Sequence, residues 1–335
     1  MKIKQVIAAF LSAILMLALF SGCSNMKDEP TALSETPGPV SGTAVSADQY
    51  VSESMTDAGM PEPKGGVYEM PKAEAAGKLT DGNEKCSLDY SNTEDGYVMV
   101  KYLGKNTKVK VQLTGPSSVT YTYNLSLTGE WDVLPLSDGS GSYKLGVYEN
   151  ISGTKYSTAF TKSMNVTLSD EFEPFLRSNK YVNIVPGSKA EKLAAELTSG
   201  LETTPEKVRE IYLYVINNIS YDYDLAANVK SGYIPVLDDV LAAGKGICFD
   251  YAALMAGMLR TCGVPTKLVV GYAGEAYHAW INTYSQESGW VEASIYFDGK
   301  QWKLMDPTYA SNGKGREDII AYIGNGANYV AKYLY

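Results

Sequence analysis

The sequence has a single histidine, His278, among its 335 residues, and only four cysteines. If the protein performs thiol chemistry, no other histidine can serve as its base. Cys248 lies 30 residues before this histidine, and Asp306 lies 28 residues after it. The Cys-His-Asp order is therefore more informative here than it would be in a histidine-rich chain.

Positive charge is also scarce. The chain has 29 Lys and Arg residues against 38 Asp and Glu residues, which gives a formal net charge of −9. Loss of an N-terminal segment containing Lys2 and Lys4 would move this charge to −11. A polyanion such as a nucleic acid is therefore not an expected partner.

The apolar run at residues 6–20 is shorter than the roughly 20 residues that a membrane span needs. Two lysines precede it and small residues follow it, as is typical of an export signal. The segment Phe20-Ser21-Gly22-Cys23 resembles a bacterial lipobox with Phe20 in place of the usual leucine. We therefore expect residues 1–22 to be a lipoprotein signal peptide and Cys23 to be the lipidation site. The alternative is a plain secreted protein in which Cys23 has no role.

This reading places the mature protein outside the cytoplasm, anchored by lipid to the bacterial cell membrane. Residues 23–85 are rich in Ser, Thr, Pro, Gly, Ala and Glu, with Tyr50 and Tyr68 as their only aromatic residues. Such a stretch cannot bury enough apolar surface to fold, so we interpret it as a disordered tether. Its root-mean-square reach is on the order of 40 Å.

The remaining cysteines do not suggest a disulfide framework. Cys248 and Cys262 are predicted on one helix, 14 residues and therefore about 21 Å apart, which is beyond disulfide reach. Only a bridge between Cys86 and Cys262 is left, and we instead expect Cys262 to be a small buried side chain.

Residues 86–170 show strand after strand. Val109, Val111 and Leu113 alternate with polar residues, which predicts one apolar and one solvated face. The same period recurs around residues 119–127, 143–147 and 164–168, with turn residues between the segments. We predict a small all-β sandwich of an immunoglobulin-like kind, although the Cys-Trp-Cys signature of antibody domains is missing. A spacer or a substrate-presenting module is the expected role.

Residues 171–335 begin with helices and end with strands, which predicts an α+β domain. Thr203 and Glu206 form a capping-box pattern at the start of one helix. Gly244 and Gly246 interrupt the chain just before Cys248, where we expect a helix that runs to about residue 261. The expected strands are residues 267–272, 277–284, 290–297 and 301–305.

The predicted positions of three residues suit acyl-transfer chemistry. At a helix N-terminus, Cys248 gains a dipole that favours a thiolate and backbone N–H groups that can bind an oxyanion. His278, on a strand, can take the thiol proton and return it to a leaving amine. Asp306, immediately before Pro307, can orient the imidazole. Taken one at a time, these residues are more often a buried thiol, a strand residue and a turn residue.

Three separated motifs resemble the transglutaminase-like superfamily. They are residues 244–254 (GKGICFDYAAL) with the following 259–265, residues 278–280 (HAW), and residues 302–308 (WKLMDPT). The resemblance covers about residues 175–335 and implies a papain-like core with Cys248 as nucleophile, His278 as base and Asp306 as its orienting partner. It also implies a second oxyanion donor, for which Tyr221 or Tyr223 is the candidate.

Two patterns are missing from this resemblance. The Cys-Gly-Ser-Cys-Trp motif of papain is absent, and so is EF-hand spacing, so a calcium requirement is not supported. We expect no cofactor and no metal.

The first hypothesis is a lipid-anchored cysteine hydrolase, a peptidase or amidase, acting on peptides of surface proteins or the cell wall. The second keeps the acyl-enzyme but lets an amine attack it, which gives a protein-glutamine transamidase. The third is a catalytically inactive surface scaffold that binds its partners. An unreactive Cys248 would favour the third.

Overall fold

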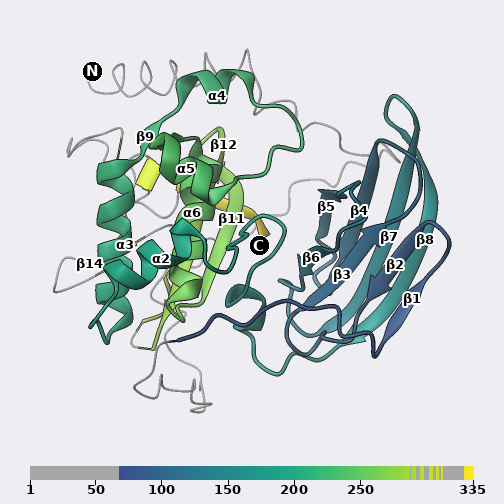
Figure 1. Ribbon diagram of the computed structural model, residues 1–335, viewed down its shortest axis with the longest axis horizontal. Coiled ribbons are helices and arrows are strands. Elements are labelled where there is room, and N and C mark those ends of the chain that lie inside the picture. The colour runs from purple at the N-terminus through teal and green to yellow at the C-terminus, as the bar shows by residue number, and fades with distance from the viewer. Residues whose placement is uncertain are drawn as a thin grey trace, which may run out of the picture.

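The computed structural model describes residues 68–335, except residues 287, 292–294, 298–301, 305–306, 309–310 and 312–327. A β-rich region and an α+β region lie side by side in it (Figure 1). The expected signal peptide, the lipidation site Cys23 and the candidate Asp306 lie outside the described residues.

The β-rich region consists of two four-stranded sheets in which every neighbouring pair is antiparallel. One sheet has the order β1 (Thr80–Gly82), β2 (Cys86–Asp89), β3 (Tyr97–Tyr102), β6 (Asp132–Pro135). The other has the order β5 (Thr120–Asn124), β4 (Val109–Thr114), β7 (Gly141–Ser152), β8 (Lys155–Val166). The predicted sandwich is confirmed.

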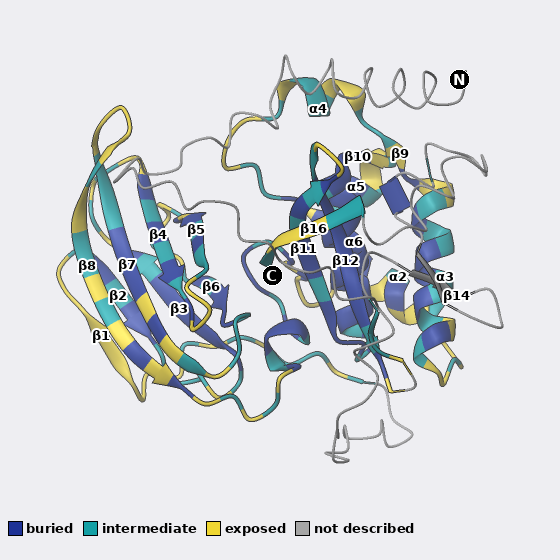
Figure 2. Cartoon of the chain, turned by 180° about the vertical axis from the view of Figure 1, so that it is seen from behind, coloured by how far each residue is buried: buried dark blue, intermediate teal, exposed yellow. Residues whose placement is uncertain are grey.

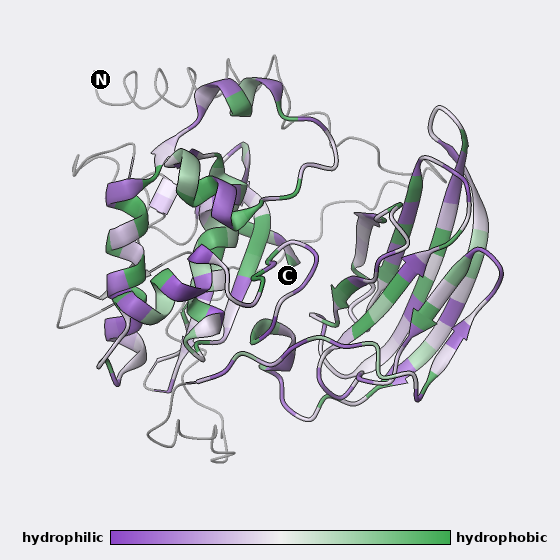
Figure 3. Cartoon of the chain, viewed as in Figure 1, coloured by the Kyte–Doolittle hydropathy of each residue, from purple (hydrophilic) through white to green (hydrophobic). Residues whose placement is uncertain are grey.

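Alternation along the strands explains how the sandwich closes. Val109, Val111 and Leu113 of β4 are buried, whereas the residues between them are only partly buried. They belong to the same core as Leu88 and Val100 of the facing sheet. The alternation is visible as bands of hydropathy along these strands (Figure 3).

Residues before the boundary at 85 that composition suggested already pair with the sandwich. Strand β1 pairs with β2, and the backbone N–H of Gly77 donates to Asp89 Oδ2 over 2.6 Å. The N–H groups of Lys78 and Leu79 both donate to Ser91 Oγ. Backbone hydrogen bonds, rather than buried apolar side chains, hold this polar segment on the sheet.

The α+β region opens with a short 3₁₀ turn, η3 (Glu173–Phe175), and continues with helices. These are α2 (Lys189–Leu197), α3 (Thr204–Asn218), α4 (Tyr223–Asn228), α5 (Leu237–Ala243) and α6 (Cys248–Thr261). The expected capping box of α3 is present, because Thr203 Oγ1 accepts from Glu206 N–H and the Glu206 carboxylate accepts from Thr203 N–H. Among the helices of the described part, not one has the length and apolar character to cross a membrane.

The main sheet of this region is antiparallel, in the order β13 (Gly289–Val291), β12 (Ala276–Ser285), β11 (Thr266–Ala273), β16 (Tyr329–Leu334). Two smaller pairs accompany it: β9 (Ser220–Tyr221) runs parallel to β10 (Lys245–Gly246), and β14 (Ile295–Phe297) runs antiparallel to β15 (Trp302–Leu304). The main helices precede the strands of the main sheet in the chain, which is the predicted α+β order.

Helix α6 lies at the centre of this region and packs against β11, β12, α2 and α3. Its residues from Asp250 to Arg260 are all buried, so it has no solvated face (Figure 2). This differs from a surface helix, which buries one apolar stripe and exposes its opposite side to solvent.

The two regions meet at an aromatic cluster. Tyr335, at the end of β16, makes edge-to-face contacts with Tyr121 and Tyr123 of β5 and with Tyr181. A buried ion pair lies in the same junction, where Lys180 Nζ is 2.5 Å from Asp132 Oδ1. Lys180 N–H also donates to Val133 O, so the chain between the regions is fixed to β6.

This ion pair predicts an asymmetric mutational response. Asp132→Ala leaves the Lys180 ammonium buried without its carboxylate, so we expect it to lower the free energy of unfolding by about 3–5 kcal/mol. The double variant Asp132→Ala, Lys180→Met should recover most of this loss, because no buried charge is left. Urea unfolding followed by circular dichroism measures both.

Lys162→Ala is the matched control, because Lys162 pairs with Asp81 at the surface. It should change the unfolding free energy little. A small loss in Asp132→Ala, or no recovery in the double variant, would contradict a structural role for the buried pair.

Candidate active site

The turn before α6 determines where the helix begins. Gly244 ends α5 in the left-handed conformation, with φ of 59°. Gly246 then lies against Asp250, and a Cβ at this position would come within 2.6 Å of the Asp250 Cβ. Glycine is therefore required at both positions, by backbone conformation at the first and by close packing at the second. The helix begins at Cys248, as predicted.

Cys248 is the first residue of α6 and is 8% exposed. The first N–H groups of a helix have no partner within the helix. The N–H groups of Asp250 and Tyr251 both donate to Ile247 O. Among the described residues, no hydrogen bond takes up the backbone N–H of Cys248 or Phe249. In the described part of the chain, these two donors of the first turn therefore have no protein acceptor.

Asp250 is a site residue that the sequence analysis did not single out. It is fully buried, and its Oδ2 accepts from Ile247 N–H over 2.8 Å. Its Oδ1 accepts from Tyr233 OH over 2.7 Å. Burial raises the pKa of the Asp250 carboxyl, and these two hydrogen bonds act in the opposite direction. An acidic residue at the third helical position was the available signal, because it is the capping-box position.

His278 lies on β12, opposite Gly271 of β11, and is 6% exposed. Its ring is stacked on that of Trp280 with centroids 6.2 Å apart, as expected for residues two apart on one strand face. Gly271 leaves room for this indole, since a Cβ there would lie 2.8 Å from Trp280 Cη2.

The intervening residues of β12, Ala279 and Ile281, belong to the core that includes α6. Helix α6 packs on β11 and β12, so the helix that carries Cys248 and the strand that carries His278 are neighbours. Alternation along β12 places His278 and Trp280 on the opposite strand face from Ala279 and Ile281. For the expected triad, the structure gives the surroundings of Cys248 and His278, while the third member, Asp306, is outside the described residues.

The oxyanion candidates occupy different positions. Tyr221 of β9 is paired with Gly246 of β10, and Asp222 N–H donates to Gly246 O over 2.9 Å. This pairing places Tyr221 beside the segment that leads into Cys248. Tyr223 begins α4, is 51% exposed and contacts the Tyr221 ring at 5.0 Å between centroids.

The other described cysteines are free thiols in buried positions. Cys262 Sγ lies 3.2 Å from Met258 O just after α6, as expected for a small buried side chain. Cys86 lies in β2, and burial raises the pKa of its thiol to about 11. Neither has the helix-start environment of Cys248.

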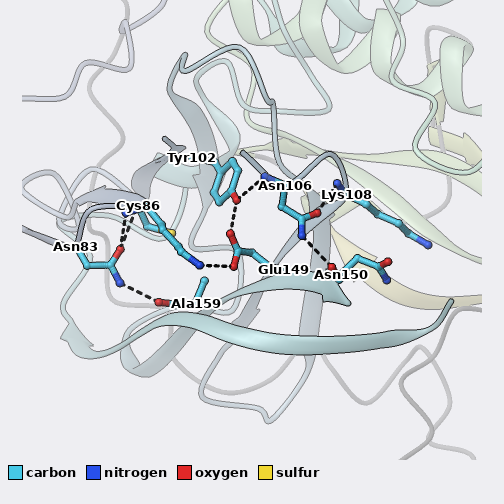
Figure 4. Close-up of polar contacts among 9 residues, drawn as sticks. Asn83, Cys86, Tyr102, Asn106, Lys108, Glu149, Asn150 and Ala159 are labelled. Carbon is cyan, nitrogen blue, oxygen red and sulfur yellow. Dashed lines mark hydrogen bonds and ion pairs between the residues drawn. The ribbon is translucent and has the colours of Figure 1, made fainter. Parts of the chain in front are cut away.

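A second polar cluster lies on the sandwich, beside an open surface hollow of about 410 Å³. Glu149 accepts hydrogen bonds from Tyr102 OH and from Lys85 Nζ, and Asn106 N–H donates to the Tyr102 hydroxyl (Figure 4). These groups satisfy one another. In the described part of the chain, no group of three His, Cys, Asp or Glu side chains is placed to hold a metal ion.

The sequence model of the transglutaminase-like superfamily matches residues 191–307 of this chain. This segment includes Cys248, His278 and Asp306. The human kyphoscoliosis peptidase is 28% identical over 155 residues, which cover 46% of this chain and 23% of that protein. A protein-glutamine gamma-glutamyltransferase of Pseudomonas aeruginosa is 27% identical over 135 residues, which cover 36% of this chain and 18% of the relative.

Among solved structures, the periplasmic domain of TgpA from Pseudomonas aeruginosa is similar, with a TM-score of 0.33 and 17% identity. The match covers 72% of this chain and 98% of that one. The chain spans about a fifth of the length of the curated relatives it matches.

Two aspartates near the start of α6 should respond to pH with opposite signs. The pKa of Asp250 is raised, mainly by burial, so its contribution to stability is full below its ordinary value of 3.8 and is lost as pH rises through the raised value. We therefore expect Asp250→Asn to gain stability relative to the wild type as pH rises from about 4 to 7.

Asp222→Asn is the control of opposite sign. Its N-cap hydrogen bond from Leu225 N–H, together with Lys245, lowers the pKa of Asp222. That contribution is present above the ordinary value and is lost as pH falls, so this variant should lose stability relative to the wild type as pH rises. Urea midpoints across the pH series measure both slopes. Equal slopes for the two variants would contradict the assigned environments.

Proposed function

We propose that the transglutaminase-like domain at residues 191–307 makes this protein a cysteine hydrolase that cleaves peptide or amide bonds through an acyl-enzyme. Cys248 is the nucleophile, His278 the base and Asp306 the residue that orients His278. The observation that carries the proposal is the position of Cys248 at the first residue of a buried helix, beside two backbone N–H groups without a protein acceptor.

In the first half-reaction, His278 takes the thiol proton and Cys248 Sγ attacks the carbonyl carbon of the substrate. The oxyanion that forms accepts from the N–H groups of Cys248 and Phe249, and Tyr221 is the candidate for a further donor. His278 then gives its proton to the leaving amine as the carbon–nitrogen bond breaks. Water attacks the thioester in the second half-reaction, releases the acid and restores the thiol.

The same acyl-enzyme could pass its acyl group to an amine, which would give transamidation in place of hydrolysis. The names of the relatives support both chemistries, since one is a peptidase and the other a glutamyltransferase. Both outcomes share the first half-reaction and differ only in the molecule that attacks the thioester.

The location of the reaction follows from the N-terminal sequence. An export signal at residues 1–22 and lipidation at Cys23 would place the enzyme outside the cytoplasm, attached to the membrane of a bacterial cell. Peptides of the cell wall or of surface proteins are then the substrates within reach.

Alkylation by iodoacetamide at pH 7 tests the nucleophile. Peptide mass spectrometry of the full chain follows each cysteine separately, with Cys86 and Cys262 as references in the same molecule. We expect Cys248 to react at least about tenfold faster than either reference, because a helix start and an imidazole favour a thiolate. His278→Ala should slow Cys248 by about tenfold and leave the references unchanged. If Cys248 reacts no faster than Cys86 and its alkylation rate is the same in the His278→Ala variant, the protein is a binding scaffold instead.

The products separate the two enzyme hypotheses. Incubation with a glutamine-containing peptide mixture and an excess of a primary amine should give new carboxyl termini or free acids if water is the acceptor. Covalent amine conjugates would identify the transamidase. Cys248→Ala is the control in both cases and should give neither product.

A further inference from the structure

Residues 229–236 join α4 to α5, and we call this segment the strap. It contacts both the sandwich and the first turn of α6. It runs from α4 toward the sandwich and returns to α5 (Figure 1). Gly232 of the strap has φ of 89°, and a Cβ there would lie 2.6 Å from Asn124 Nδ2 at the end of β5. The strap therefore lies directly against the sandwich at this glycine.

The next residue connects the strap to the helix. Tyr233 OH donates to Asp250 Oδ1 over 2.7 Å, and Asp250 Oδ2 accepts from Ile247 N–H. Each carboxylate oxygen thus has its own donor, one from the strap and one from the N-cap residue. Because Asp250 is fully buried, an oxygen without a donor would be costly here.

Asp250 is a potential competitor at the proposed site. The start of a helix attracts any anion, and a carboxylate two residues from Cys248 can bind the same N–H groups that a thiolate or an oxyanion needs. In the structure it does not, because its two oxygens are occupied by Tyr233 and Ile247. The N–H groups of Cys248 and Phe249 stay without an acceptor among the described residues.

We propose that Tyr233 is a positioning residue for Cys248: by binding Asp250, it keeps this carboxylate from taking the helix-start N–H groups that serve the nucleophile. The inference rests on the proposed function of Cys248. It assigns to the strap, and through Gly232 to the sandwich, a direct part in the geometry of the site.

Removal of the Tyr233 hydroxyl has a defined consequence. Asp250 Oδ1 loses its donor, and we expect the carboxylate to turn to the open N–H groups at the start of α6, which are in the same turn. The carboxylate charge then stands where the thiolate charge should develop, so thiolate formation is disfavoured. The effect acts through the charge of Asp250, and it should vanish when this charge is removed.

The experiment is a double-variant cycle on the full chain, with the rate of Cys248 alkylation by iodoacetamide at pH 7 as the readout. The four proteins are the wild type, Tyr233→Phe, Asp250→Asn and the double variant. Loss of a hydrogen bond to a charged group predicts that Tyr233→Phe slows Cys248 by about tenfold. In the Asp250→Asn background the same change should have less than about a twofold effect.

Tyr143→Phe controls for a purely structural effect. It also removes a hydroxyl with several hydrogen bonds from a buried tyrosine, but in the sandwich, where the hydroxyl donates to Gly139 O over 2.8 Å. It should lower the unfolding midpoint and leave the rate at Cys248 unchanged. Thermal melts of all the variants, together with the slow references Cys86 and Cys262, show that the folded protein is being measured.

The outcomes are distinguishable. A slow Tyr233→Phe variant whose defect disappears in the Asp250→Asn background supports the inference. If Tyr233→Phe reacts like the wild type while His278→Ala is slow, the inference is wrong and the proposed function stands. An equal defect in both backgrounds also overturns it, since Tyr233 then acts by another route. A wild-type Cys248 as slow as Cys86 overturns the proposed function and the inference together.

Discussion

The buried guanidinium of Arg260 is the interaction on which the rest of the structure depends. It lies near the end of α6 and donates to three backbone carbonyls, those of Thr266, Arg177 and Tyr335. Burial lowers the pKa of Arg260 to about 9, so the group stays protonated at neutral pH. A charge without water is tolerated only where such donors are satisfied, so these carbonyls have to meet at one point. They come from the start of β11, the segment between the two regions, and the end of β16.

This convergence explains why the helix that carries Cys248 has no solvated face. One end of α6 is fixed to β11 and β16 by Arg260, and the other end is held by Asp250. Because Tyr335 also contacts Tyr121 and Tyr123, the segment that Arg260 holds is the one that meets the sandwich. Phe249, the residue after the candidate nucleophile, contacts Tyr181 of the same aromatic cluster. The sandwich therefore packs on the elements of the site and is more than a distant spacer.

Features of the fold that depend on neighbouring residues could be predicted from the sequence. Gly244 and Gly246 placed the start of α6, and the alternation of Val109, Val111 and Leu113 placed β4 in the sandwich. The features that the sequence did not predict depend on hydrogen bonds between residues 12 to 17 positions apart. The segment just before β1 is held by hydrogen bonds from Gly77 and Lys78 to Asp89 and Ser91, which a count of apolar residues does not detect. The hydrogen bond between Tyr233 and Asp250 joins residues that are 17 positions apart, and Tyr233 lies in an irregular segment. No periodic pattern in the sequence therefore predicts this bond.

The helices of the α+β region differ in how their first N–H groups are capped. At α2, α3 and α4 a side chain of Ser188, Thr203 or Asp222 accepts an N–H group, as in most helices. At α6 the N-cap residue is Ile247, whose side chain has no acceptor, and Asp250 supplies only the return bond to the N-cap N–H. The chain direction is thus fixed while the donors beside Cys248 stay open. A serine at position 247 would stabilise the helix by about 1 kcal/mol and would occupy a donor in the same turn. Helix α5 also begins without a side-chain cap, at Val236, so what sets α6 apart is that its open donors lie in the same turn as Cys248.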